Sequence, residues 1–296
     1  MSLFQPFDPD DPERRKRRLP PLPQVPLRLV LPNLVTLVAL CTGLTSIRMS
    51  IEHKFDLAVA LIAVAAALDG IDGRMARFLK STSRFGAELD SITDFLNFGV
   101  APVILLYVWA LGEMRSVGWM AALIFAICAA LRLARFNVAL DAPDKPDWHA
   151  RFFVGVPAPA GAMTVLLPVY LEFVAIPHGF VTAPAVFVYT IAVGLLMVSK
   201  LPTWSGKLIG RRIARELVTP LFVSAVLIVA FLASFPWETM TVLTLCYIAC
   251  LPLSWRSFHE HLRVEAEAAA AADGVARPGA AAGKLDPVPP PDADAG

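Results

Sequence analysis

The sequence predicts an all-α, polytopic membrane protein, built as a transmembrane helical bundle of about eight spans. Its 296 residues are 56% hydrophobic and have a mean hydropathy of +0.61, which is too apolar for an ordinary soluble domain. Apolar stretches close to the roughly 20 residues that a membrane-spanning helix needs recur along the chain. They predict helices near residues 31–51, 56–79, 86–111, 117–138, 157–176, 181–199, 218–235 and 237–255.

Basic residues in the loops predict the orientation of these helices. Loops after the odd-numbered spans carry little more than Lys54 and Arg115. Loops after the even-numbered spans are much richer in Lys and Arg, with Lys80, Arg84, Lys145, Arg151, Lys200, Lys207, Arg211, Arg212, Arg215, Arg256 and Arg263. By the positive-inside rule, both termini and the loop between the second and third spans face the cytoplasm.

Composition divides the chain into four parts. Residues 1–27 are Pro-rich with a run of five basic residues, so we expect a disordered cytoplasmic arm that attracts anionic lipid or only enforces orientation. Residues 28–200 form a six-helix transmembrane core, and residues 201–263 add an interfacial segment and two further transmembrane helices. Residues 264–296 are an Ala/Pro-rich tail that cannot bury a core and is expected to be disordered.

Two local features refine this organisation. The basic stretch 200–217 contains Trp204 and is expected to form a short helix at the membrane interface. Pro157 and Pro159 are expected to open the fifth span, because proline is tolerated in the first turn of a helix.

Four carboxylates stand close together in otherwise apolar sequence at the second and third spans. An ionised carboxylate at membrane depth is unfavourable unless it is paired, hydrated or bound to metal. Asp69 and Asp72 are three residues apart, and Asp90 and Asp94 are four apart, so each pair projects from one face of a helix. Two facing helices would present all four to one point. Oxygen-only ligands favour Mg²⁺ or Mn²⁺ and argue against zinc.

The same segment matches the signature D-x-x-D-G-x-x-A-R-x(8)-G-x-x-x-D-x-x-x-D, and thereby resembles the CDP-alcohol phosphotransferases. The matching residues are Asp69, Asp72, Gly73, Ala76, Arg77, Gly86, Asp90 and Asp94. Eight fixed positions across 26 residues make a chance match far less likely than for a short motif. The resemblance implies that family's helical fold, with residues 28–200 as its catalytic core.

Further stretches resemble the bacterial phosphatidylserine synthases of this family. They are residues 68–77, 83–91, 94–102, 131–137 and 153–161, and the resemblance covers about residues 30 to 200. It implies that CDP-diacylglycerol and L-serine are the substrates and that phosphatidylserine and CMP are the products. It also implies a multi-pass protein of the inner (cytoplasmic) membrane that forms a homodimer, embedded in the lipid bilayer, without a nucleic-acid partner.

The resemblance also assigns roles to the carboxylates. Asp69, Asp72 and Asp90 would be ligands of a divalent cation, Mg²⁺ or Mn²⁺, with two ions in the site. Asp94 would contribute to the metal site and act as the general base on the incoming hydroxyl, because an aliphatic alcohol is a poor nucleophile until its proton is removed.

The residues around the carboxylates are candidates for binding the CDP group. Gly73 and Gly86 lack Cβ, which permits close helix packing and close approach of the nucleotide. Arg77 is placed to meet phosphate, or alternatively extends to the membrane interface. The remaining candidates are Ala76, Thr36 and Asn33, although Asn33 could equally cap the first helix.

Arg132 and Arg135, in the fourth span, are candidates for binding phosphate or the alcohol acceptor, together with Arg84 in the second loop. A guanidinium can clamp a phosphate or the carboxylate of serine with two parallel hydrogen bonds. The alternative is that the two arginines of the fourth span only anchor it at the cytoplasmic face.

Two other functions compete with serine transfer. The first is the same chemistry with another alcohol, such as glycerol 3-phosphate, inositol or choline. The second is a cation- or proton-coupled transporter with carboxylates inside the membrane. A transporter would not explain the spacing of Gly73, Arg77 and Gly86.

Overall fold

The computed structural model describes residues 27–79, 83–140, 152–174, 182–199, 201–204 and 215–276. The predicted basic arm and most of the loop lysines and arginines lie outside these residues. The chain divides into two compact units, Met1–Trp109 and Ala110–Gly296, and each is described by itself.

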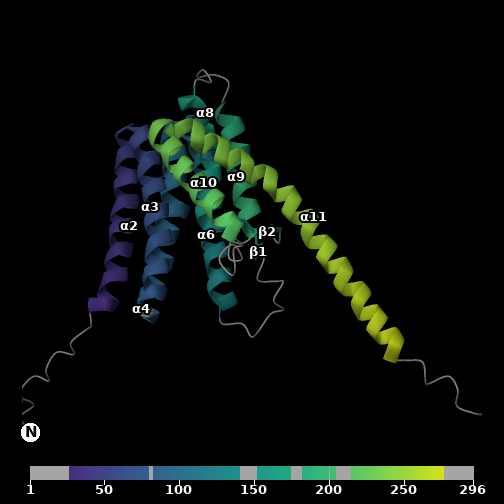
Figure 1. Ribbon diagram of the computed structural model, residues 1–296. Helices are drawn as coiled ribbons and strands as arrows, with labels where there is room; N and C mark the ends of the chain where they lie inside the picture. The colour runs from purple at the N-terminus through teal and green to yellow at the C-terminus, as the bar shows by residue number, and fades with distance from the viewer. Residues whose placement is uncertain are drawn as a thin grey trace, which may run out of the picture. The chain divides into compact units, whose positions relative to one another are not determined.

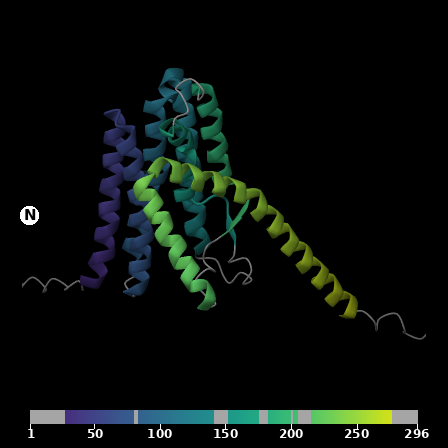
Figure 2. The same cartoon turned by 45° about the horizontal axis from the view of Figure 1, so that its top comes forward.

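The first unit is a set of antiparallel helices. Its elements are α2 (Leu27–Ile51), α3 (Phe55–Phe78), α4 (Arg84–Asp94), the π-helix η1 (Phe95–Val100) and α5 (Ala101–Trp109). Helices α2 and α3 lie side by side along their length (Figures 1 and 2). The Ser46 hydroxyl of α2 donates to the Ala58 carbonyl of α3 at 2.8 Å in the buried contact between them.

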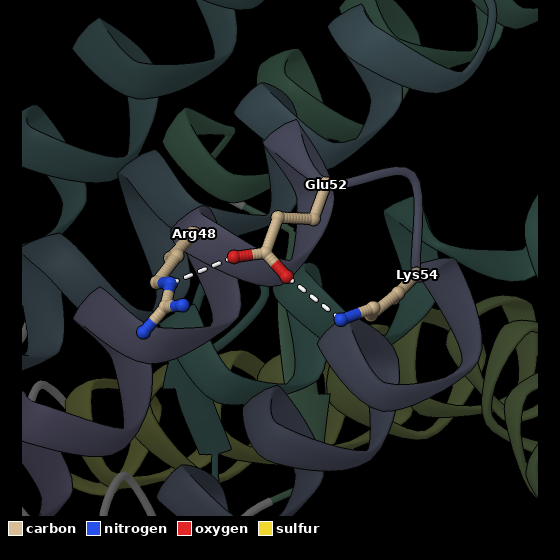
Figure 3. A network of polar contacts seen from close by, with 3 residues as sticks. All are labelled: Arg48, Glu52 and Lys54. Carbon is tan, nitrogen blue, oxygen red and sulfur yellow. Dashed lines mark hydrogen bonds and ion pairs between the residues drawn. The ribbon is translucent and has the colours of Figure 1, made fainter.

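A tight turn joins α2 to α3. His53 adopts a positive φ of 58° in this turn. Glu52 accepts hydrogen bonds from Arg48 Nε and Lys54 Nζ, each at 2.8 Å (Figure 3). These bonds, from Lys54 first and then Arg48, lower the pKa of the Glu52 carboxyl below its ordinary value. The three side chains lie at the surface, so they contribute little to stability and mainly close the turn.

The π-helix η1 interrupts the long helix that α4 and α5 would otherwise form together. Asn97 in η1 is fully buried, and its Nδ2 donates to the Ala39 carbonyl of α2 at 3.1 Å. A Cβ at Gly43 would overlap the Asn97 side-chain amide. Gly43 therefore provides the space that lets the Asn97 amide lie against α2.

The second unit is also helical, with one pair of short strands. Its elements are η2 (Leu111–Met114), α6 (Arg115–Leu140), β1 (Phe152–Val154), α7 (Ala158–Val165), α8 (Leu167–Phe173), α9 (Ala183–Val198), β2 (Pro202–Trp204), α10 (Arg215–Ser234) and α11 (Pro236–Ala276). Helix α6 packs on α9, where Gly194 lies against Phe125. Helices α10 and α11 form a hairpin (Figure 2), and every side chain of residues 218–234 is exposed.

Each of the eight stretches predicted to span a membrane contains helix at the expected place. Among the described residues, four helical segments are long and apolar enough to cross a membrane: Val30–Ile51, Arg84–Trp109, Leu111–Ala139 and Pro236–Arg256. Ala183–Val198 and Val218–Ser234 are shorter. The predicted fifth span begins at α7 with Pro157 and Pro159, as expected, but is divided after Val165 into α7 and α8.

Two segments differ from the sequence-based expectation. Residues 202–204 do not belong to an interfacial helix but form strand β2, antiparallel to β1, with Trp204 opposite Phe152; residues 205–214 lie outside the described part. Helix α11 continues through Ala276, past residue 264, where the disordered tail was expected to begin. The Ala- and Glu-rich composition of that stretch explains the helix, since both residues have high helix propensity.

We predict that Gly43→Ala destabilises the protein. The new methyl group would overlap the Asn97 amide, and overpacking of this kind costs about 1–3 kcal/mol. Gly70→Ala is the matched control, because a Cβ there meets no heavy atom within 4 Å, and the change should be neutral or stabilise the helix by up to about 1 kcal/mol. Thermal unfolding of the purified proteins in one detergent measures both. Equal unfolding temperatures would contradict the close contact between Gly43 and Asn97.

Candidate active site

Three carboxylates of the first unit converge at one point. Asp69 and Asp72 lie on α3 and Asp90 lies on α4, and each offers one carboxylate oxygen within 4.8 Å of the others. Asp72 is buried, with 3% of its surface exposed, whereas Asp69 and Asp90 are half-buried. The spacing in the sequence therefore translates into one acidic cluster made by two helices.

The start of α4 is set by a local hydrogen bond. The side chain of Ser83 caps the helix by accepting the Gly86 backbone N–H at 3.0 Å. This cap satisfies one of the free N–H groups at a helix start. It fixes where α4 begins, and hence which turn carries Asp90.

Asp94 lies one turn beyond Asp90, and its carboxyl group interacts directly with that of Asp69. Its Oδ1 atom is buried and has no hydrogen-bond partner among the described residues, and the same holds for Asp72 Oδ1. Carboxylates in such contact repel each other unless a proton or a cation lies between them.

The donor set fits a divalent metal ion. Carboxylate oxygens are the ligands preferred by Mg²⁺, Mn²⁺ and Ca²⁺. Within the described residues, ion pairs join only Glu52 to Arg48 and Lys54, so no Lys or Arg of that part of the chain forms an ion pair with the cluster. Asp72 and Asp94 each have a buried oxygen without a partner among the described residues. A bound cation would satisfy both of these oxygens.

Helix α2 contributes the neutral polar groups of the site. The Thr36 hydroxyl donates to Asp72 Oδ2 at 2.9 Å. Asn33 lies beside Gly86, where an added Cβ would be 2.8 Å from Asn33 Oδ1. Of the nucleotide-binding candidates, Gly73 and Gly86 lie in the helices that form the acidic cluster, Thr36 bonds to it, and Asn33 lies beside Gly86.

The two glycines of the signature have different surroundings. Gly86 has close neighbours, because an added Cβ would lie 2.8 Å from Asn33 Oδ1 and 3.1 Å from Ser83 Oγ, so the Asn33 side chain would have to shift. At Gly73 the nearest atom to an added Cβ is Arg77 Nη1, at 3.9 Å. Close helix packing was expected to require glycine at this position, but the structure leaves room for a side chain. Gly73 instead leaves open space beside the carboxylates, with Arg77 exposed one turn further along α3.

The remaining candidates are placed as follows. Ala76 is half-buried on α3, and Arg84 is exposed as the first residue of α4. Arg132 and Arg135 belong to α6 in the second unit, where they bind backbone carbonyls. Arg132 Nε donates to Val156 O at 3.1 Å, and Arg135 Nη1 donates to Val198 O at 2.7 Å.

These carbonyl contacts were not expected from the sequence. Arg132 is buried, with 6% of its surface exposed, and its guanidinium lies 5.8 Å from the centre of the Phe136 ring. It thus joins α6 to the segment that follows β1. Asn97 was missed as well, although a lone amide inside an apolar span was a usable signal.

Comparison with known proteins decides between a phosphotransferase and a transporter. Residues 29–198 match the family model described as CDP-alcohol phosphatidyltransferase, and residues 216–252 match a second, described as CDP-alcohol phosphatidyltransferase 2. The chain belongs to the CDP-alcohol phosphatidyltransferase family. Membership makes it a transferase rather than a transporter, and the acidic cluster of α3 and α4 lies within the matched region.

Several relatives in this family carry one name, CDP-diacylglycerol–serine O-phosphatidyltransferase. The Mycobacterium leprae protein is 40% identical over 235 residues, which cover 76% of this chain and 74% of that protein. The Mycobacterium tuberculosis protein is 37% identical, covering 77% of this chain and 79% of the relative. A more distant one, from Methanocaldococcus jannaschii, is 34% identical and covers 59% and 74%.

We predict that the acidic cluster binds Mn²⁺ in the absence of substrate. Asp90→Asn removes one of the converging ligands and should weaken binding by more than the roughly 10–100-fold that loss of an outer-shell partner costs. Electron paramagnetic resonance of Mn²⁺ titrated into metal-stripped protein measures this, and Mg²⁺ should compete. Asp56→Asn, which removes an exposed carboxylate at the other end of α3, is the control. Equal affinities in both variants would locate the metal elsewhere.

Proposed function

We propose that this protein transfers the phosphatidyl group of CDP-diacylglycerol to the hydroxyl of L-serine, giving phosphatidylserine and CMP. The observation that carries the proposal is the convergence of the signature carboxylates Asp69, Asp72 and Asp90 within 4.8 Å, with Asp94 beside them. The shared name of the relatives supports serine as the acceptor.

The reaction exchanges one phosphate bond for another. The serine Oγ attacks the β-phosphorus of CDP-diacylglycerol and forms the new P–O bond, while the bond to the bridging oxygen breaks and CMP leaves. Asp94 accepts the hydroxyl proton. A phosphoanhydride is replaced by a phosphodiester, so no ATP is required.

Asp69, Asp72, Asp90 and Asp94 would hold the divalent cation, Mg²⁺ or Mn²⁺, as a pair of ions. When bound, the metal would polarise the pyrophosphate and stabilise the charge on the attacking and leaving oxygens. The residues of the chain position the reactants. Half-burial of the cluster limits access of water, which would otherwise compete with serine for the phosphoryl group.

We assign the CDP group to the residues that surround the cluster. Gly73 leaves open space beside the carboxylates, and the exposed Arg77 can reach a phosphate from the next turn of α3. Ala76, Gly86 and Asn33 complete this set, whereas the hydroxyl of Thr36, the remaining candidate, is already bonded to Asp72. Arg132 and Arg135 of the second unit, together with Arg84, are proposed to bind either a phosphate group or the carboxylate of the serine acceptor.

The proposed setting is the inner (cytoplasmic) membrane, with the protein as a homodimer. Four segments of the described part of the chain are long and apolar enough to span it, and the helices at the other expected positions would complete eight spans. The basic loops favour cytoplasmic termini and a cytoplasmic site, reached by serine from the water and by the lipid from the bilayer. Residues 28–200 would form the catalytic core, and residues 201–263 would add the helical hairpin. Residues 1–27 and 264–296 would be the N-terminal arm and the C-terminal tail.

The decisive experiment supplies purified protein with CDP-diacylglycerol and labelled serine. We expect phosphatidylserine and CMP in equal amounts, loss of both in excess EDTA, and recovery with Mg²⁺ or Mn²⁺. Asp94→Asn should lower turnover by at least the roughly 10²-fold typical of a general base and still bind CDP-diacylglycerol. CMP release that requires glycerol 3-phosphate, inositol or choline, and not serine, would change the acceptor. Near-normal turnover of Asp94→Asn would remove it from the mechanism.

A separate prediction concerns the arginines of α6. If a guanidinium holds the serine carboxylate, Arg132→Lys or Arg135→Lys keeps the charge but loses the two-pronged geometry. The KM for serine should then rise far more than the KM for CDP-diacylglycerol. Arg115→Lys, at the opposite end of the same helix, is the control. An unchanged serine KM in both variants would leave these arginines with their carbonyl contacts alone and place the acceptor site elsewhere.

A further inference from the structure

The Thr36 hydroxyl lies between two acceptors. It is 2.9 Å from Asp72 Oδ2 on the neighbouring helix and 3.1 Å from the Pro32 carbonyl one turn back on its own helix. Both side chains are buried, with 5% of Thr36 and 3% of Asp72 exposed. The contact is thus a buried polar link between α2 and α3 at the acidic cluster.

A hydroxyl has one proton, so it can donate fully to only one of the two acceptors. Hydrogen bonds to an ionised carboxylate are roughly twice as strong as those between neutral groups. The Pro32 carbonyl is also the ordinary acceptor for the Thr36 backbone N–H in an α-helix. The proton therefore belongs to Asp72 whenever that carboxylate is charged.

This bond distinguishes the two oxygens of Asp72. Oδ2 is held by Thr36, whereas Oδ1 is buried with no hydrogen-bond partner among the described residues. Asp72 also offers an oxygen within 4.8 Å of oxygens from Asp69 and Asp90. We propose that Thr36 is a positioning residue that holds Asp72 by Oδ2 and so presents Oδ1 as a single metal-ligating oxygen.

The proposal deepens the function proposed above, on which it rests for the identity of the site, and it revises the role of Thr36. From the sequence, Thr36 was expected to touch the nucleotide. A side chain that is 5% exposed, with its hydroxyl already engaged, is poorly placed for that contact. Threonine also suits positioning, because its branched Cβ restricts the side chain to few rotamers in a helix.

The backbone of α2 is itself held in place at this level. Ala39, three residues beyond Thr36 and on the same face, accepts the hydrogen bond from Asn97 of η1 at 3.1 Å. One face of α2 is thus bonded both to α3, through Thr36, and to the element that follows Asp94. A fixed α2 is what allows one hydroxyl to set the orientation of a carboxylate on another helix.

The test is Mn²⁺ binding to the purified, metal-stripped full-length chain, measured by electron paramagnetic resonance without lipid or alcohol. Thr36→Val keeps the shape but removes the hydroxyl, and should weaken binding by about 10–100-fold, the range for loss of an outer-shell partner. Thr36→Ser keeps the hydroxyl and should stay within about threefold of the wild type. Thr45→Val is the matched control, since Thr45 is exposed on the same helix and its hydroxyl donates to the Cys41 carbonyl one turn back on that helix.

Two outcomes would overturn the proposal. The first is wild-type Mn²⁺ affinity in Thr36→Val. The second is a raised KM for CDP-diacylglycerol at saturating metal with unchanged metal affinity, which would return Thr36 to the nucleotide site. If Thr36→Val is not monodisperse in detergent, Thr36→Ala removes the hydroxyl without filling its space and gives the same comparison. Because the binding measurement contains no substrate, failure of serine transfer would leave the Mn²⁺ affinities, and the role of Thr36 that they test, unaffected.

Discussion

Electrostatic repulsion among the clustered carboxylates is the constraint on which the first unit depends. Two unit charges at the 4.8 Å limit that bounds the cluster repel by about 3 kcal/mol at an effective dielectric constant of about 20. Three such pairs approach about 10 kcal/mol, comparable with the roughly 5–15 kcal/mol that stabilises a whole domain. The folded protein must therefore lower the negative charge at Asp69, Asp72 and Asp90, either by protonating carboxylates or by binding a cation. A ligated cation satisfies this requirement and is also what phosphoryl transfer needs.

Helix α2 acts as the template for the site. Asn33 lies against Gly86 of α4, Thr36 bonds Asp72 of α3, and Gly43 accommodates the amide of Asn97. These three positions of α2 are spaced by three and seven residues, which places them on one helix face. Each contact joins α2 to an element that carries a carboxylate or directly follows one. Of the converging carboxylates, Asp72 is thus held directly by a helix that contributes no carboxylate of its own.

The sequence was sufficient for features that depend on composition and spacing. Apolar stretches located the helices, and the Asp69–Asp72 and Asp90–Asp94 spacings predicted the acidic cluster. It was insufficient where the outcome depends on which partner a polar group meets. Nothing local to Trp204 indicates pairing with Phe152, far away in the chain, and the π-helix at Asn97 follows from its fit against Ala39 and Gly43. The division of the fifth span follows locally from Pro168, whose missing N–H interrupts the helix.

The arginines of α6 show why a structural contact and a ligand-binding role need not exclude each other. A guanidinium carries five N–H donors and a carbonyl oxygen uses one of them. Arg132 bonds Val156 O through Nε, and Arg135 bonds Val198 O through Nη1, so each retains a pair of donors suited to a carboxylate or phosphate. The carbonyl bond also removes much of the rotamer freedom that a free arginine would lose on binding. An arginine held by the backbone is therefore better prepared to recognise an anion than an unrestrained one. Lysine, with a single ammonium group, cannot hold the carbonyl and clamp the anion in the same geometry.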